Sequence, residues 1–218
     1  MNASAPLPRL MLVTDRRRTR HREMIPLLAE AVRGGVGLIQ IREKDLPDDA
    51  LRELLQQIRA AIPRETRVVV NSSHRVARTT SIGLHLPAAE PLPWSRQSGW
   101  RPPLFGRSAH DEGEVRAAIE DQVDYLVLGT VFPTPSKPGH SGGGAELVRQ
   151  MATLARPLPL FAIGGITVSR IPELIHAGAY GVAVCGAILS ANDPRRVAEA
   201  LTLALQVSAK VNPPFRDS

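Results

Sequence analysis

The fold of this chain is decided by one stretch, residues 36–72, which reads VGLIQIREKDLPDDALRELLQQIRAAIPRETRVVVNS. The runs Gly37–Lys44 and Arg67–Ser72 are short and rich in Ile, Leu or Val, which predicts two strands. Between them, Asp48–Ala61 has acidic residues at its start and Pro63 just beyond its end, which predicts a helix. A strand, a helix and a strand in this order predict two parallel strands of one sheet.

The same alternation continues along the rest of the chain. The predicted strands are Arg9–Thr14, Gly37–Lys44, Arg67–Ser72, Gly83–Leu86, Leu104–His110, Tyr125–Thr130, Leu160–Gly164 and Gly181–Cys185. The other predicted helices are Arg22–Arg33, Asp111–Asp121, Ala145–Ala155, Ser169–Ala177 and a last one from Asp193 to about Val207. Eight such units in roughly 200–250 residues predict an α/β fold of the (β/α)8 TIM-barrel type. The rival interpretation is an open, doubly wound parallel sheet.

One unit of this pattern is irregular. Residues 87–103, PAAEPLPWSRQSGWRPP, are rich in proline and polar side chains, so we expect a degenerate fourth helix. The sequence contains no low-complexity segment and no stretch that reads as a domain linker. We therefore expect a single barrel domain over residues 9–208, with a flexible N-terminus at 1–8 and a flexible tail at 209–218.

Composition limits the classes of function. The chain has 218 residues, 43% of them hydrophobic, which is enough for one sizeable core. Its net charge of +6 suits an anionic ligand such as a phosphate. The single cysteine excludes an internal disulfide, and no apolar run approaches the roughly 20 residues that span a bilayer. With no signal-peptide pattern at the N-terminus, we expect a soluble, cytoplasmic protein that does not bind membranes.

The carboxyl ends of the strands should carry the chemistry, because active sites of such barrels form there. Gln40, Arg42 and Lys44 alternate along one predicted strand and so point to one face, where fixed cations would bind a phosphate or pyrophosphate. The alternative is a set of surface charges paired with Glu43 or Asp45. Asn71 and Ser108 also lie at strand ends and are expected to line the site.

Two glycine-bearing turns predict a second anion site. FAIGGI, residues 161–166, and AVCGAIL, residues 183–189, end neighbouring strands, where backbone N–H groups of Gly164, Gly165 and Gly186 could approach phosphate oxygens. Cys185 lies beside the second turn and is expected to be an inert thiol in its lining.

Residues 129–144, GTVFPTPSKPGHSGGG, form a long predicted loop after the sixth strand. Loops of this length are usually lids or disordered segments. We favour a lid that brings Thr134, Ser136 and Lys137 over a bound phosphate.

Histidines provide one candidate proton carrier. His110 shares a predicted face with Ser108 at a strand end and could transfer a proton, although a structural role is equally compatible with its position. His85, on the short fourth strand, is expected to be structural. The remaining histidines show no metal-ligand spacing, so we predict no metal site from them. The run RRRTRHR, residues 16–22, lacks interleaved aromatic residues and is interpreted as a solvated loop rather than a nucleic-acid surface.

Taken together, these strand ends resemble the thiamine phosphate synthase and TenI superfamily. The segments LVTDR, QIREK, VVVNS, GLHL, GRSAH, LGTVFPTPSK, FAIGGI and HAGAYGVAVCGAIL occur in the order found in that family and cover nearly the whole chain. The resemblance implies a TIM barrel that acts in thiamine biosynthesis on a small phosphorylated thiazole. From the residues themselves we expect no nucleic-acid or membrane partner, and a homodimer is one option.

The resemblance also poses a choice between two reactions. A synthase couples a pyrimidine pyrophosphate to a thiazole phosphate. It is expected to bind pyrophosphate with the residues at positions 42, 44, 71 and 137. It also holds Mg²⁺ with two aspartates, at whose positions this chain has Ser72 and Glu90. Because Ser72 has no charge and Glu90 lies in an altered loop, coupling is expected to be crippled.

A TenI-like thiazole tautomerase needs no cofactor and no metal, and it is the function that the sequence favours. The resemblance gives the phosphate to the glycine turns, the substrate carboxylate to Arg42 or Lys44, and the proton to His110. Two alternatives stay open. One is a thiamine phosphate synthase with Mg²⁺ held by Glu90, and the other is a non-catalytic ligand-binding or regulatory paralogue.

Overall fold

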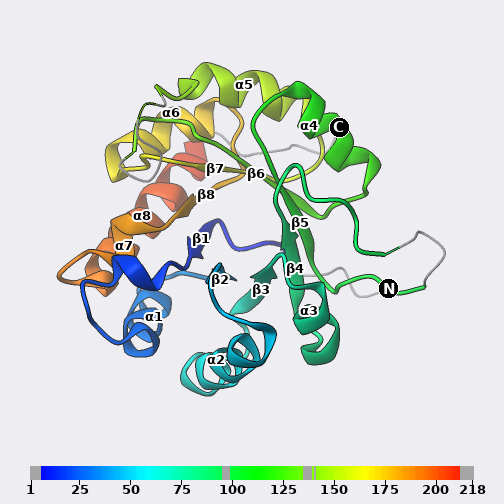
Figure 1. Ribbon diagram of the computed structural model, residues 1–218. Helices are drawn as coiled ribbons and strands as arrows, with labels where there is room; N and C mark the ends of the chain where they lie inside the picture. Colours follow the sequence, from blue (N-terminus) through cyan, green and yellow to red (C-terminus); the bar gives the residue numbers. More distant parts are fainter. Residues whose placement is uncertain (1–5, 95–98, 135–138, 140, 212–218) are drawn as a thin grey trace.

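Eight parallel strands close into a barrel in this computed structural model, which describes residues 6–94, 99–134, 139 and 141–211 (Figure 1). The strands are β1 (Leu10–Val13), β2 (Leu38–Ile41), β3 (Arg67–Asn71), β4 (Gly83–Leu86), β5 (Phe105–Ala109), β6 (Tyr125–Leu128), β7 (Leu160–Ile163) and β8 (Gly181–Val184). Each pairs with the next in sequence, and β8 returns to β1 with Met11 opposite Ala183. The barrel prediction is therefore confirmed, and the open sheet is excluded.

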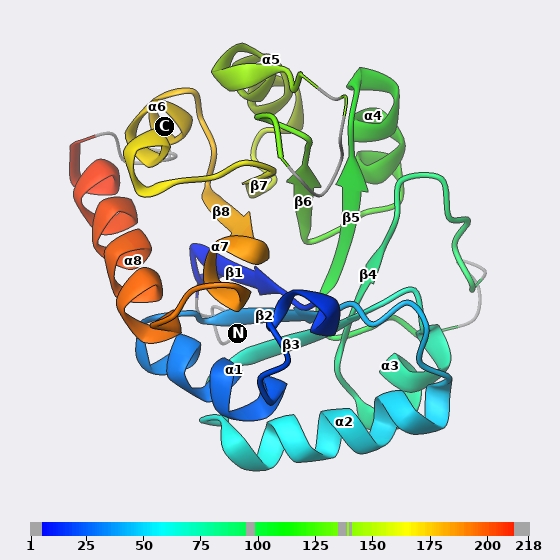
Figure 2. The same cartoon turned by 60° about the vertical axis from the view of Figure 1, so that its left-hand side comes forward.

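Helices surround this barrel (Figures 1 and 2). They are α1 (Met24–Arg33), α2 (Asp48–Ala61), α3 (His74–Thr80), α4 (Glu112–Glu120), α5 (Gly144–Ala155), α6 (Ile171–His176), α7 (Gly186–Leu189) and α8 (Pro194–Val211), with short 3-10 helices η1 (Arg16–Arg18) and η2 (Val168–Arg170). The sequence did not predict α3 or α7. Among the described residues between β4 and β5 there is no helix, as the composition of that segment predicted.

The predicted ends of the domain differ from the observed ones. Helix α8 ends at Val211 and includes residues 209–211, which the sequence assigned to a flexible tail. At the other end, the Leu7 carbonyl accepts a hydrogen bond from the Tyr180 hydroxyl, so this part of the predicted flexible N-terminus contacts the barrel. The segments 1–5 and 212–218 lie outside the described residues.

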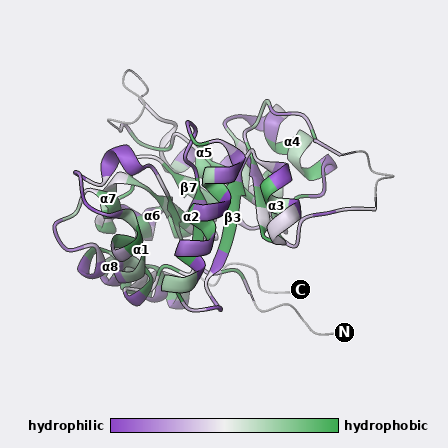
Figure 3. Cartoon of the chain, turned by 60° about the horizontal axis from the view of Figure 1, so that its bottom comes forward, coloured by the Kyte–Doolittle hydropathy of each residue, from purple (hydrophilic) through white to green (hydrophobic). Residues whose placement is uncertain are grey.

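Amphipathic helices explain how the outer layer packs. Helix α2 buries Leu51, Leu55 and Ile58, which recur at helical spacing, and it has acids in its first turn, where the helix dipole favours them. In Figure 3 the outer helices carry both hydrophilic and hydrophobic residues, whereas β7 in the centre is mainly hydrophobic. No helix of the described residues is long and apolar enough to cross a membrane.

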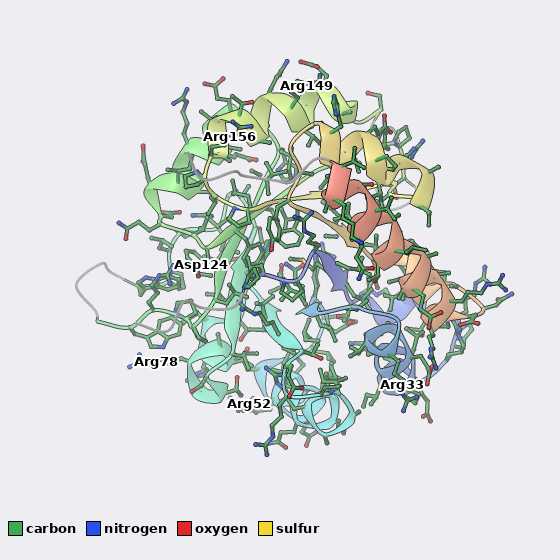
Figure 4. All side chains as sticks on the ribbon, turned by 180° about the vertical axis from the view of Figure 1, so that it is seen from behind. Arg33, Arg52, Arg78, Asp124, Arg149 and Arg156 are labelled. Carbon is green, nitrogen blue, oxygen red and sulfur yellow. The ribbon has the colours of Figure 1, made fainter. Side chains whose placement is uncertain are left out.

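Charges on the outer helices are largely paired locally. Arg33, Arg52 and Arg149 lie at the periphery of the molecule (Figure 4). Each forms an ion pair with an acid three residues earlier on its own helix. Such exposed pairs contribute little stability, at most about 1 kcal/mol each. These three arginines are therefore engaged within their own helices.

The barrel interior is filled by side chains that include Met11, Leu38, Val69, Tyr125 and Phe161, all of them fully buried. The Tyr125 and Phe161 rings meet edge to face with centroids 5.7 Å apart. Gly106 makes room for this pair, because a Cβ at that position would lie 2.1 Å from Cζ of Tyr125. The interior of the barrel around these residues is therefore a packed core and not a pore.

We expect Gly106→Ala to lower the free energy of unfolding by about 1–3 kcal/mol, the usual effect of overpacking a core. The Tyr125 ring cannot shift freely, since its hydroxyl lies 3.1 Å from Nδ1 of His85. Gly113→Ala is the control, because Gly113 is exposed in α4 and a Cβ at that position would come no closer than 3.4 Å to another atom, Oδ1 of Asp111. That change should stabilise the helix by up to about 1 kcal/mol. Urea unfolding of both variants measures the difference, and equal effects would contradict the packing argument.

Candidate active site

A cavity of about 1270 Å³ lies at the carboxyl ends of the strands. Its lining includes every described residue that the sequence predicted for binding or catalysis, namely Gln40, Arg42, Lys44, Asn71, Ser108, His110, Thr134, Gly164, Gly165, Cys185 and Gly186. Ser136 and Lys137, the other residues of the predicted lid, lie outside the described residues. The structure thus brings the predicted positions together, while their roles stay predictions.

The end of β2 differs in detail from the prediction. The strand stops at Ile41, so Arg42 and Lys44 belong to the turn that follows it. The backbone N–H of Arg42 donates to Oγ1 of Thr14 over 2.9 Å, which fixes the start of this turn against β1. Both cations still line the cavity.

The two acids proposed as alternative partners of these cations are engaged elsewhere. Asp45 pairs with Arg16 at 2.8 Å and with Arg17 at 3.2 Å. Glu43 accepts a hydrogen bond from the backbone N–H of Arg16 over 3.1 Å. These contacts favour the interpretation in which Arg42 and Lys44 serve a ligand rather than neighbouring acids.

Two buried polar atoms at this end of the cavity have no hydrogen-bond partner among the described residues. They are Nε2 of Gln40, a donor, and Oε1 of Glu43, an acceptor, and their residues are only 4% and 5% exposed. An unpaired buried polar group costs about 1–3 kcal/mol, which a polar ligand or an ordered water would offset. Sequence alternation missed Glu43, because the strand ends two residues before it and the alternation does not extend that far.

The turn after β7 has a backbone conformation that favours glycine. Gly164 and Gly165 adopt φ values of +105° and +61°, which side chains rarely tolerate. A Cβ at Gly165 would lie 2.6 Å from the Pro133 carbonyl oxygen, so the loop after β6 packs directly on this turn.

Two arginines flank the glycine turns and were not predicted. Arg18 comes from η1, and its Nη1 lies 3.7 Å from where a Cβ of Gly186 would stand. Its carbonyl accepts from Oγ of Ser190 just after α7, which holds η1 and α7 together (Figure 2). Arg170 donates from Nη1 to the Gly165 carbonyl over 2.6 Å and stacks on the Phe132 ring at 4.1 Å. Both line the cavity and add positive charge beside the predicted phosphate site.

A hydrogen-bonded chain crosses the ends of β3 and β4. Nδ2 of Asn71 donates to Oγ of Ser72 over 2.8 Å, and that hydroxyl donates to Oε2 of Glu90 over 2.7 Å. The longer side chain of Glu90 therefore delivers its carboxylate to the end of β3, where Ser72 itself offers no charge. The described residues contain no cluster of three or more His, Cys, Asp or Glu that could hold a metal.

His110 stands at the cavity rim in a defined orientation. Its Nδ1 lies 2.8 Å from Oε2 of Glu114, and its backbone N–H donates to the same oxygen over 2.7 Å. A carboxylate at Nδ1 favours the tautomer with its proton on that nitrogen, which leaves Nε2 as a hydrogen-bond acceptor. The side chain is 46% exposed, which permits exchange of protons with solvent.

His85 and Cys185 are both inert at neutral pH. The His85 ring lies 3.1 Å from the Tyr125 hydroxyl through Nδ1 and 2.9 Å from Oγ of Ser108 through Nε2. Burial, with Arg42 and Arg107 nearby, lowers the pKa of His85 from 6.5 to about 3, so the ring stays neutral. Burial raises the pKa of the Cys185 thiol to about 11, which keeps it protonated. The structural roles predicted for these two residues stay predictions.

Comparison with known proteins gives a consistent picture. Residues 10–188 match the family described as "Thiamine monophosphate synthase". The chain is 39% identical to "Thiamine-phosphate synthase" of Mycobacterium sp. (strain KMS), covering 90% of this chain and 92% of that protein. It is also 39% identical to "Thiamine-phosphate synthase" of Streptomyces avermitilis, covering 88% and 90%. A solved structure, "Thiamine phosphate pyrophosphorylase from Pyrococcus furiosus", superposes with a TM-score of 0.80 at 27% identity, covering 92% of this chain and 96% of the other.

We expect the neutral His85 to make the stability of the protein depend on pH. Between pH 6.5 and about 3, the unfolded chain binds a proton at this position that the folded chain does not. The free energy of unfolding should therefore fall as the pH falls below 6.5, by up to about 1.4 kcal/mol per pH unit from this site.

His85→Gln removes the titration while keeping a polar side chain, so its unfolding energy should fall less steeply between pH 6.5 and 4.5. Denaturant unfolding at several pH values measures the two slopes, and His74→Gln, at an exposed position, is the matched control. Identical slopes for the unmodified protein and His85→Gln would show that His85 is not held neutral.

Proposed function

Because the chain belongs to the thiamine monophosphate synthase family, we propose that it is a thiamine phosphate synthase, which couples hydroxymethylpyrimidine pyrophosphate to thiazole phosphate. The names of its relatives support this function, which the sequence alone left as an alternative, over the TenI-like tautomerase that it favoured. The observation that carries the proposal is the contact between Ser72 and Glu90, because it puts a carboxylate beside the strand end from which an aspartate is missing.

The residues present fit a magnesium ion that is shared with the substrate. Mg²⁺ is usually bound through one or two carboxylates together with substrate phosphates and waters. Ser72 and Asn71 line the cavity and offer hard oxygen atoms, and Glu90, which is not itself a lining residue, would supply one carboxylate beside the Ser72 hydroxyl. A bound Mg²⁺ would neutralise charge that develops on the departing pyrophosphate.

The cavity offers separate partners for the two anionic groups. Arg42 and Lys44 lie beside β2 and suit the pyrophosphate of the pyrimidine substrate. The turns at Gly165 and Gly186, with Arg18 nearby, suit the phosphate of the thiazole. In the reaction a bond forms between the thiazole and the pyrimidine, and pyrophosphate leaves toward the cations. Nε2 of Gln40 and Oε1 of Glu43 are a buried donor and acceptor that the polar pyrimidine would satisfy.

We expect the protein to form thiamine phosphate from both substrates in the presence of Mg²⁺ and to stop when a chelator is added. Glu90→Gln keeps a hydrogen-bonding side chain but removes the charge, so the coupling rate should fall by about 10²-fold, equivalent to about 2.7 kcal/mol of transition-state stabilisation. Glu112→Gln, which removes an exposed acid from α4, is the control. Product can be followed by conversion to a fluorescent derivative. No coupling by the unmodified protein would refute the proposal.

The second candidate is the thiazole tautomerase, and one observation favours it. The contact between Nδ1 of His110 and Glu114 orients the imidazole at the cavity rim, as a proton carrier requires. This reaction needs no metal, so Ser72 in place of an aspartate would not impair it.

The same preparation should be given the dihydrothiazole carboxylate phosphate without metal, and aromatisation should be followed by absorbance. A tautomerase would be insensitive to chelator and would lose about 10²-fold or more in His110→Ala. As a synthase, the protein should leave this compound unchanged. Absence of both reactions would leave the ligand-binding paralogue as the remaining interpretation.

A further inference from the structure

The segment that carries Glu90 is held by a single buried cation. Arg107 belongs to β5, where its neighbour Ser108 faces the cavity, and alternation turns the Arg107 side chain to the other face. The residue is only 6% exposed. A buried guanidinium is strongly destabilising unless it is paired, and here Nη1 forms an ion pair with Asp121 at the end of α4.

The other end of this guanidinium contacts three carbonyls of one loop. Nη2 donates to the Ala88 oxygen over 2.9 Å, to the Pro87 oxygen over 3.3 Å and to the Glu90 oxygen. Proline lacks an N–H, and the Glu90 N–H is used within the loop by a bond of 3.2 Å to the Pro87 oxygen. Arg107 therefore supplies an anchor that the proline-containing loop does not supply from its own donors.

This anchor fixes a wall of the cavity and the direction of Glu90. Pro87 and Ala88 line the cavity, so their position sets its shape on this side. Glu90 comes two residues after Ala88, and its side chain reaches Ser72 over 2.7 Å. The contacts form one chain from Asp121 through Arg107 and the loop to Glu90 and Ser72.

We propose that Arg107 is a positioning residue that holds the Glu90 carboxylate ready for the magnesium ion of the Mg²⁺–pyrophosphate complex. The inference rests on the proposed function and extends it. Neither Arg107 nor Glu90 is among the residues that line the cavity, and the Glu90 carboxylate meets the cavity wall at Ser72, which does line it. Arg107 therefore acts through the loop and touches no substrate. Residues behind a metal ligand typically change metal affinity by about 10- to 100-fold when they are replaced. Loss of Arg107 should therefore weaken the binding of pyrophosphate that depends on Mg²⁺. It should leave unchanged the binding of metal-free pyrophosphate, which depends on Arg42 and Lys44.

The test compares inorganic pyrophosphate with and without Mg²⁺, using isothermal titration calorimetry on the intact protein. For the unmodified protein, the Mg²⁺ complex should bind more tightly than metal-free pyrophosphate. In Arg107→Met this advantage should shrink by about tenfold or more, while binding of metal-free pyrophosphate changes little. A purely structural role of Arg107 would weaken both forms equally.

Two further variants make the comparison secure. Arg101→Met is the matched control, because Arg101 also joins a carboxylate, Asp124 at 2.8 Å, to a carbonyl, that of Gln122 at 2.9 Å, but does not contact the Glu90 loop. Arg107→Lys keeps the positive charge opposite Asp121 but loses the several N–H donors of the guanidinium. It should therefore fold and still bind the Mg²⁺ complex with a smaller advantage over metal-free pyrophosphate. If Arg107→Met does not fold, the same measurement is made on Arg107→Lys.

The outcomes separate the inference from the proposed function. An undiminished Mg²⁺ advantage in Arg107→Lys and in any folded Arg107→Met would overturn the role of Arg107 alone. No Mg²⁺ advantage in the unmodified protein would overturn the metal-dependent synthase and this inference with it. A loss of the advantage in Arg101→Met as large as in the Arg107 variants would show that the effect is general and would also overturn the inference.

Discussion

The pairing of β8 with β1 is the constraint on which the rest of the structure depends. Because all eight strands are parallel, closing the sheet brings every carboxyl end to one mouth. The strands are only four or five residues long, so the residue after each strand is already at that mouth. Residues as distant in sequence as Gln40 and Gly186 thereby line one cavity.

The charge at this mouth is arranged asymmetrically. Three consecutive arginines of η1 pair with acids, since Arg16 and Arg17 contact Asp45 and Arg18 contacts Asp15. Asp45, just after β2, is thus paired with arginines of η1, the short helix that follows β1. Arg42 and Lys44 line the cavity. Arg170 adds further positive charge near the glycine turns, where Arg18, paired with Asp15, also lines the cavity. In a partly enclosed cavity such fields act over a lower dielectric than water, which favours polyanionic ligands.

Much of the fold could be predicted from the sequence, because the alternation of apolar strands with amphipathic helices is local information. Helix α2 and strand β4 have the predicted bounds. Helix α3 was missed, because its sequence HRVARTT shows no long apolar period, and its start depends on the Ser73 cap, whose oxygen accepts from Val76 N–H over 3.3 Å. Helix α7 was also missed, because its four residues are too few to show a helical period.

The site was predictable only where it follows strand ends. Gln40, Asn71 and Gly165 could be placed by counting along strands, since closure of the barrel dictates where these positions lie. Arg18 and Arg170 could not, because η1 and η2 follow turns whose direction is set by tertiary contacts such as that between Ser190 and the Arg18 carbonyl. The reach of Glu90 was equally hidden, since it depends on the shape of a loop whose carbonyls accept hydrogen bonds from the distant Arg107 side chain.

The exchange of two carboxylates for one also has a physical logic. Two aspartates facing each other repel unless a cation lies between them, whereas a serine and a glutamate can satisfy each other directly. In this chain Ser72 donates to Glu90, so the site is electrostatically stable before any metal arrives. The same hydrogen bond occupies one carboxylate oxygen, which a metal must share or replace. Under the proposed function, a pyrophosphate that brings its own Mg²⁺ would supply most of the coordinating oxygens, so that one carboxylate from the protein would suffice.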